Sequence, residues 1–232
     1  MLVSELYNLF RSDVADTVKP YLWSDNEVYD YMNDAYRMFV RKTGGIPDAS
    51  SSFLRIPIVA TVAYANISPL ILKFRIASLE STGADIKIIN AEDVDKIMRN
   101  DYGSYSPVNV NTPGPVTHMV IGLERTADSA LVRWVQKPIV NDYANLIVYR
   151  LPKDKVTADA QDFNFREINE EHHVHLMHWM KHRAYGKQDA ETFDKGKREE
   201  FRLAFENYCA MATDENDRYK SKPVRTVRYG GI

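Results

Sequence analysis

The sequence contains a single cysteine, Cys209, and it has no long apolar run. One thiol cannot form an intrachain disulfide, which favours a reducing compartment, and no local signature around it indicates a nucleophile. The longest uncharged stretch, from Ile56 to Leu72, is interrupted by prolines and is shorter than the roughly 20 residues that a membrane-spanning helix needs. Residues 1–16 carry acidic side chains and no apolar core, so we do not expect them to be a signal peptide.

Motifs of catalytic and nucleotide-binding sites are also missing. The sequence has no GxGxxG, GxxxxGK[ST], GxSxG, HExxH or CxxC pattern. The net charge of -2 gives no overall attraction to nucleic acid or to an anionic membrane. We therefore predict a protein that is not an enzyme, needs no cofactor and acts through assembly with other proteins.

Both ends of the sequence have the periodicity of amphipathic helices. Residues 2–11 predict a short first helix, which Pro20 separates from a second. Ser24 and Glu27 predict a capping box at the start of that second helix, and Gly44 predicts its end. Its apolar stripe is predicted to contain Val28, Tyr31, Met32, Ala35, Tyr36 and Phe39.

The C-terminal part predicts two further helices joined by a short turn. The first begins near Asn169 and stops near Gly186, and the second runs from about Ala190 to Thr213. The inward stripe of the second helix is predicted to contain Phe193, Phe201, Ala204, Phe205, Tyr208, Met211 and Ala212. Because each helix must bury its apolar face, we expect the helices of both chain ends to form one three- or four-helix bundle.

Residues 50–151 have the pattern of strands. Runs of β-branched and aromatic residues are separated by turn formers, and Asp128 with Ser129 predicts the clearest hairpin. Within this part, residues 90–103 predict a short helix and residues 100–116 a loop. We expect a mainly antiparallel sheet or sandwich of about five or six strands.

The predicted fold class is α+β: a helical bundle formed by both chain ends, an inserted, mainly antiparallel β subdomain, and an extended C-terminal arm. The segments are expected to follow one another along the chain. They are N-terminal helices in residues 1–48, the β subdomain in 49–160, a helical hairpin in 161–213 and the arm in 214–232.

Histidines are concentrated in one short segment, residues 172–182. At 100° per residue, three of them share one helical face with an acidic residue, and helix-borne ligands at such spacing can hold a metal when other ligands face them. These residues, called the His face below, are Glu171, His175, His178 and His182. Because the far side of the helix is apolar, we expect the His face to point outward, to solvent or a neighbouring subunit. A metal site is the alternative.

The C-terminal segment is basic and has no acidic side chain after Asp217. Since Pro223 prevents a helix from continuing, we expect an extended arm that pairs with a sheet edge or fills a groove of an acidic partner. A disordered tail is the alternative, and non-specific contact with nucleic acid would be sensitive to salt. The candidate partner-binding residues are Arg218, Lys220, Lys222, Pro223, Arg225, Arg228, Tyr229 and Ile232.

Several short motifs resemble those of the head-to-tail adaptor (connector) proteins of tailed bacteriophages. The opening LWSDNEVYDYMNDAYRMF resembles the first long helix of that family, and HLMHWMKHRAYGKQDAETFDKGKREEF resembles its closing hairpin. Between them, PGPVTHMV, QKP and LIVYRLP resemble its β insertion. The matching positions are Trp23, Ser24, Asp25, Glu27, Asn33, Ala35, Trp134, Lys137, Pro138, Tyr149, Pro152, Arg183, Ala184, Tyr185, Lys187 and Asp189. The His face and the loop of residues 100–116 depart from the pattern.

The resemblance implies a structural virion protein made in the bacterial cytoplasm and located at the neck of the particle. Such adaptors form a ring, commonly of about twelve copies, under the portal protein, where they extend the DNA channel and provide the platform for a tail or nozzle protein. The resemblance also implies that residues 214–232 dock on the portal. Packaged DNA would pass close by, and no membrane is involved.

Three alternatives remain open at this stage. One is a different neck or tail-completion ring protein. Another is a metal-binding protein or metal-dependent enzyme that uses the His face. The third is a monomeric binding module of a host regulator.

Overall fold

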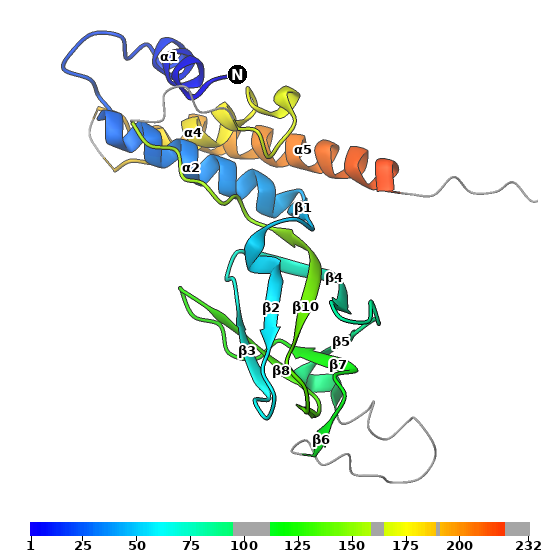
Figure 1. The fold of residues 1–232 in the computed structure, drawn as a ribbon. Helices are drawn as coiled ribbons and strands as arrows, with labels where there is room; N and C mark the ends of the chain where they lie inside the picture. Colours follow the sequence, from blue (N-terminus) through cyan, green and yellow to red (C-terminus); the bar gives the residue numbers. More distant parts are fainter. Residues whose placement is uncertain (95–111, 159–164, 189–190, 221–232) are drawn as a thin grey trace, which may run out of the picture. The chain divides into compact units, whose positions relative to one another are not determined.

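The computed structural model describes residues 1–94, 112–158, 165–188 and 191–220 of the chain (Figure 1). The chain divides into two compact units. A helical unit combines Met1–Gly44 with the chain from Asp154 onward, and a β unit consists of Gly45–Lys153. The fold is α+β with largely antiparallel sheets, as predicted. None of the helices in the described ranges is both long and apolar enough to cross a membrane.

The helical unit is organised around a short central helix, α4 (Leu176–Ala184). This helix packs against α1 (Val3–Asp13), α2 (Asp25–Lys42) and α5 (Lys195–Lys220), and α2 also contacts α5 (Figure 1). The 3-10 turn η3 (Glu170–His172) precedes α4. Residues from both ends of the sequence therefore share one helical unit.

Helix α2 begins and packs as its sequence predicts. The backbone N–H of Glu27 donates to Ser24 Oγ at 3.3 Å, and the Glu27 carboxylate accepts from the Ser24 N–H at 2.8 Å, which completes the capping box. Every member of the predicted apolar stripe is buried, together with Val40. Such a cap typically contributes about 1 kcal/mol.

Helix α5 differs from its prediction at both ends. It begins at Lys195 rather than near Ala190 and continues to Lys220, beyond the predicted end at Thr213. Its inward stripe contains Phe205, Cys209 and Ala212, which are buried. Phe193 precedes the helix and is 48% exposed, and Met211 is 61% exposed, so the prediction that these two side chains point inward is wrong.

The first sheet of the β unit is built around its longest central strand, β10 (Asp142–Arg150). On one side β10 pairs antiparallel with β1 (Ile46–Asp48) and β2 (Arg55–Ile58), and on the other side with β4 (Ile71–Leu79). The 3-10 turn η1 (Ser52–Leu54) connects β1 to β2. Because β1 starts at Ile46, the strand-rich part begins slightly before the expected residue 49.

The second sheet has the strand order β3-β8-β7-β5. Strand β8 (Ala130–Trp134) pairs antiparallel with β3 (Tyr64–Ile67) and β7 (His118–Ile121), while β5 (Lys87–Asn90) pairs parallel with β7. The predicted hairpin around Asp128 and Ser129 is confirmed, since it joins β7 to β8. Strands β6 (Pro113–Gly114) and β9 (Lys137–Pro138) form a short parallel pair. The described strands thus outnumber the five or six that we predicted.

The two larger sheets enclose the core of the β unit. The largest buried side chains there are Trp134, Ile58, Met119 and Leu146. Of the helix predicted in residues 90–103, the structure describes only the turn η2 (Ala91–Asp93) and Val94. The rest of that helix, and most of the predicted loop of residues 100–116, lie outside the described residues.

Candidate assembly site

Motif residues from the two ends of the chain meet in the helical unit. The indole N–H of Trp23, just before α2, donates to the carbonyl of Ala184 at the end of α4 at 3.1 Å. The Trp23 side chain is buried, and its ring meets that of Tyr185 edge-on at a centroid distance of 6.0 Å. Glu27 forms an ion pair with Lys187 at 2.9 Å. The matching motifs therefore stabilise one another across the sequence.

Asp25, itself exposed, belongs to a polar cluster around the buried Arg11. The Arg11 guanidinium donates to Asp25 at 2.7 Å and to the carbonyl of Trp23 at 2.6 Å, and it pairs with the carboxylate of Asp16. Burial and a hydrogen bond to Asp25 raise the pKa of Tyr7 to about 12. Since these polar groups are paired with one another, the cluster fixes the segment between α1 and α2.

Asn33 joins α2 to the segment that returns from the β unit. Its amide donates to the carbonyl of Val156 and its side-chain oxygen accepts from the Val156 N–H, both at 2.7 Å. This pair of bonds needs an amide side chain, which offers a donor and an acceptor together. Trp134 is buried in the β unit, and Asp189 lies outside the described residues.

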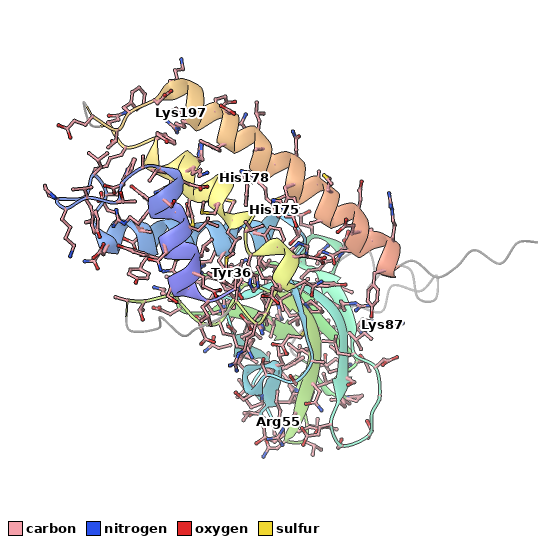
Figure 2. The ribbon with its side chains drawn as sticks, turned by 90° about the horizontal axis from the view of Figure 1, so that it is seen from above. Tyr36, Arg55, Lys87, His175, His178 and Lys197 are labelled. Carbon is pink, nitrogen blue, oxygen red and sulfur yellow. The ribbon has the colours of Figure 1, made fainter. Side chains whose placement is uncertain are left out.

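The His face packs on α5, so the prediction that it points outward is wrong. The ring of His175 stacks on Tyr208 at a centroid distance of 3.6 Å, and His178 lies parallel to Phe201 at 6.4 Å. His182 is buried, and its Nδ1 is 2.9 Å from the carbonyl of Arg198. Figure 2 labels His175 and His178 where α4 lies beside α5. Helix α4 is enclosed by α1, α2 and α5, so its apolar side and its His face are both covered.

Burial sets the electrostatics of this face. It lowers the pKa of His172, His175 and His178, and the charge that a protonated neighbouring imidazole would carry lowers each of these pKa values further. His172 Nδ1 is 2.8 Å from the hydroxyl of Tyr208. The Nδ1 of His178 is buried without a hydrogen-bond partner in the described part of the chain. These imidazoles are therefore held in their neutral form near neutral pH.

A metal centre has no support in this geometry. Within residues 1–94, 112–158, 165–188 and 191–220, no group of three or more His, Cys, Asp or Glu side chains is placed to hold a metal ion. Glu171, the acidic member of the His face, is exposed, and the histidines contact aromatic rings.

Cys209 is a buried side chain on α5. Burial raises the pKa of its thiol to about 12. Because the thiolate is the reactive form, this cysteine is not poised for nucleophilic chemistry.

Residues 214–220, which we predicted to be the start of the arm, instead continue α5. Arg218 is exposed on this last stretch, Tyr219 is 92% exposed, and Lys220 ends the helix. The other candidate partner-binding residues lie outside the described residues. They are Lys222, Pro223, Arg225, Arg228, Tyr229 and Ile232.

The fold and these contacts define an α+β structural protein whose motif residues hold its helical unit together. A family model described as the SU10 adaptor protein matches residues 1–227, and the chain belongs to this family of phage head-to-tail adaptors. The resemblance seen in the sequence is thereby confirmed. No curated protein matches the chain.

Proposed function

We propose that this protein is the head-to-tail adaptor of a tailed bacteriophage. Copies of the chain form a ring under the portal protein, extend the channel through which DNA passes, and provide the platform for a tail or nozzle protein. The protein is made in the host cytoplasm and becomes part of the neck of the virion. The match to the adaptor family over residues 1–227 carries this proposal.

The contacts of the helical unit support a scaffolding role. Trp23, Glu27 and Asn33 make their contacts within the chain, so these motif residues stabilise the helical unit. Helix α5 ends with exposed side chains, including Arg218 and Tyr219, and the basic C-terminal residues follow it in the sequence. We propose that this C-terminal segment contacts the portal, where Lys222, Arg225 and Arg228 pair with acidic side chains.

The test is sedimentation and electron imaging of the full chain with its portal protein. Wild-type protein is expected to form rings on the portal. Replacing Lys222, Arg225 and Arg228 by Glu is expected to abolish co-sedimentation.

A matched control changes three exposed cations of the helical unit, Arg37, Arg41 and Lys195, to Glu, which alters the net charge equally. The control is expected to retain binding. A wild-type chain that stays monomeric beside the portal protein and never co-sediments with it would refute the proposed function. Equal loss in both variants would refute the role of the C-terminal segment.

A further inference from the structure

The chain crosses between the helical unit and the β unit twice. The first crossing lies between Gly44 and Gly45, and the second lies between Lys153 and Asp154. A single stretch of polypeptide turns through its φ and ψ torsions, because its peptide bonds stay planar. The residues at the crossings, and the contacts on either side of them, therefore decide how tightly one unit is tied to the other.

Gly44 has the backbone freedom that a pivot requires. Its φ of 89° lies in the left-handed region that favours glycine, and a Cβ added there would meet no heavy atom within 4 Å apart from its chain neighbours. Among the described residues its backbone makes no hydrogen bond, whereas the glycine that caps a helix commonly donates back to the last turn. Gly44 thus lacks both the packing and the hydrogen bonds that would hold its torsions at one value.

The chain is fixed immediately before Gly44. The backbone N–H of Thr43 donates to the carbonyl of Phe39 at 2.9 Å, and the buried Thr43 hydroxyl donates to the same carbonyl at 3.0 Å. Lys42 is held against α5 by an ion pair with Glu206 at 3.1 Å. The last turn of α2 is therefore a fixed part of the helical unit and does not share the freedom of Gly44.

The chain is fixed again immediately after Gly44. Gly45 has a φ of 94°, and a Cβ added to it would lie 2.9 Å from the Cβ of Tyr149 and 3.3 Å from the backbone nitrogen of Arg150. Ile46 then pairs with Arg150 in the ladder of β1 and β10. Gly45 is therefore needed for close packing inside the β unit, which distinguishes it from Gly44. Only Gly44 separates the two fixed segments.

The second crossing is short and exposed. Leu151 is buried, and its N–H donates to the carbonyl of Leu70 at 2.9 Å, which fixes it in the β unit. Val156 is buried in the helical unit, where the Asn33 side chain binds both its N–H and its carbonyl at 2.7 Å. Between these anchors, residues 153–155 are exposed and belong to no helix or strand. Both crossings therefore place a few exposed residues between fixed segments, as hinges do.

We propose that Gly44 and residues 153–155 form a hinge about which the helical unit and the β unit turn relative to each other. Hinge residues are a few positions at the ends of elements that absorb changes in φ and ψ. The inference goes beyond the proposed function and does not depend on it, because the hinge is a property of the single chain. In an adaptor, such a hinge lets each unit fit its own partner without distorting α2 or β10.

Distances between pairs of spin labels on the free, full-length chain test the hinge. One pair spans the two units, with Arg37→Cys on α2 and Val140→Cys on the turn before β10. The other pair, Arg37→Cys with Glu200→Cys, lies within the helical unit. All three positions are exposed, and the natural Cys209 is buried. The pair across the units is expected to give a distance distribution at least about twice as wide as the pair within one unit. Equal widths would overturn the inference.

Two glycine variants link the width to Gly44. Gly44→Val is expected to narrow the distribution across the units, because a β-branched side chain restricts the torsions of the pivot. Gly83→Val is the matched control: Gly83 also has a positive φ, 70°, and open space around it, but it lies in a turn of the β unit. This control is expected to leave the width unchanged. An unchanged width in Gly44→Val, or equal narrowing in both variants, would overturn the assignment of the pivot.

Thermal unfolding checks that both variants fold. If Gly44→Val does not fold, Gly44→Ala, which adds only a methyl group, is compared with Gly83→Ala in the same way. The hinge and the proposed function fail in different ways. Equal widths for the two label pairs would remove the hinge and leave the association with the portal as proposed. A chain that never associates with the portal would refute the proposed function and leave the hinge in place.

Discussion

Lowering the pH should weaken the contact between α4 and α5. In the unfolded chain the imidazoles of His172, His175 and His178 take up protons with an ordinary pKa near 6.5. In the folded protein burial lowers these three pKa values. Protonation therefore favours the unfolded state. The free energy of unfolding is at its full value above about pH 6.5 and falls as the pH drops below it.

The expected size follows from proton linkage. Each proton that the unfolded chain binds and the folded chain does not bind changes the free energy of unfolding by about 1.4 kcal/mol per pH unit. Three histidines therefore give a slope of at most about 4 kcal/mol per pH unit, reached only between the unfolded and folded pKa values. Contact with Tyr208 and Phe201 half-buries the rings of His175 and His178 and so reduces the solvation of their charged forms.

The variant His178→Phe isolates one of these contributions. It removes a titrating ring and a buried Nδ1 that has no hydrogen-bond partner in the described residues, while keeping an aromatic ring beside Phe201. The slope is expected to fall by about one third. At about pH 7.5 the variant should be at least as stable as wild type, because an unsatisfied buried polar atom costs about 1–3 kcal/mol.

Urea unfolding followed by far-ultraviolet circular dichroism, repeated between about pH 7.5 and pH 5.5, measures both quantities. His118→Gln serves as a control, because His118 belongs to the β unit. The reasoning would be refuted if wild type and His178→Phe lost the same stability over this range, or if wild type lost none.

Three further outcomes are expected. Trp23→Phe removes the donor to the carbonyl of Ala184 and is expected to lower the free energy of unfolding by about 1–3 kcal/mol in denaturant titrations; no change would show that the bond is dispensable. Arg150→Met removes the buried partner of the Asp48 carboxylate and leaves it only the more distant Lys153 ammonium at 3.7 Å; the change is expected to cost about 3–5 kcal/mol, measured by the unfolding of the β unit, and a neutral effect would contradict the assignment. A thiol reagent is expected to label Cys209 only after unfolding, and rapid labelling of the native protein would contradict its burial.

The elements that the sequence predicts best are those that depend on local signals. Helix α2 has a capping box at its start and an apolar stripe of regular spacing, and both are present in the structure. The signals need only residues three or four positions apart, so they are visible without tertiary information. The hairpin between β7 and β8 is local in the same way.

The end of α5 shows why burial is an incomplete guide to helix length. The inward stripe stops at Ala212, next to the predicted helix end at Thr213. The residues that follow are mostly exposed but continue the helix to Lys220. Extending an existing helix fixes one residue for each new hydrogen bond, so it needs no apolar contact.

The direction of the His face depends on what surrounds α4. The sequence shows one apolar side and one His-rich side, and a helix packed on a single neighbour would expose the second. Here Tyr208 and Phe201 of α5 cover the His-rich side. Since Phe201 lies 23 positions after His178 and Tyr208 lies 33 positions after His175, no periodicity within α4 reveals these partners.

The chain passes from the helical unit to the β unit and back through two strands that pair with each other, β1 and β10. The two units can therefore make separate contacts with other proteins. Ile46 of β1 pairs with Arg150 of β10, and the guanidinium of Arg150 binds the carboxylate of Asp48. Although burial favours the neutral acid, the hydroxyl of Ser51 and the guanidinium of Arg150 lower the pKa of Asp48 and keep it ionised. The first and last strands of the β unit, β1 and β10, thus pair with each other where the chain enters and leaves this unit. A change in the β unit should leave α2, α4 and α5 intact, and a change at the end of α5 should leave both sheets intact. A variant that loses the proposed portal contact through the C-terminal segment should therefore keep the β unit folded.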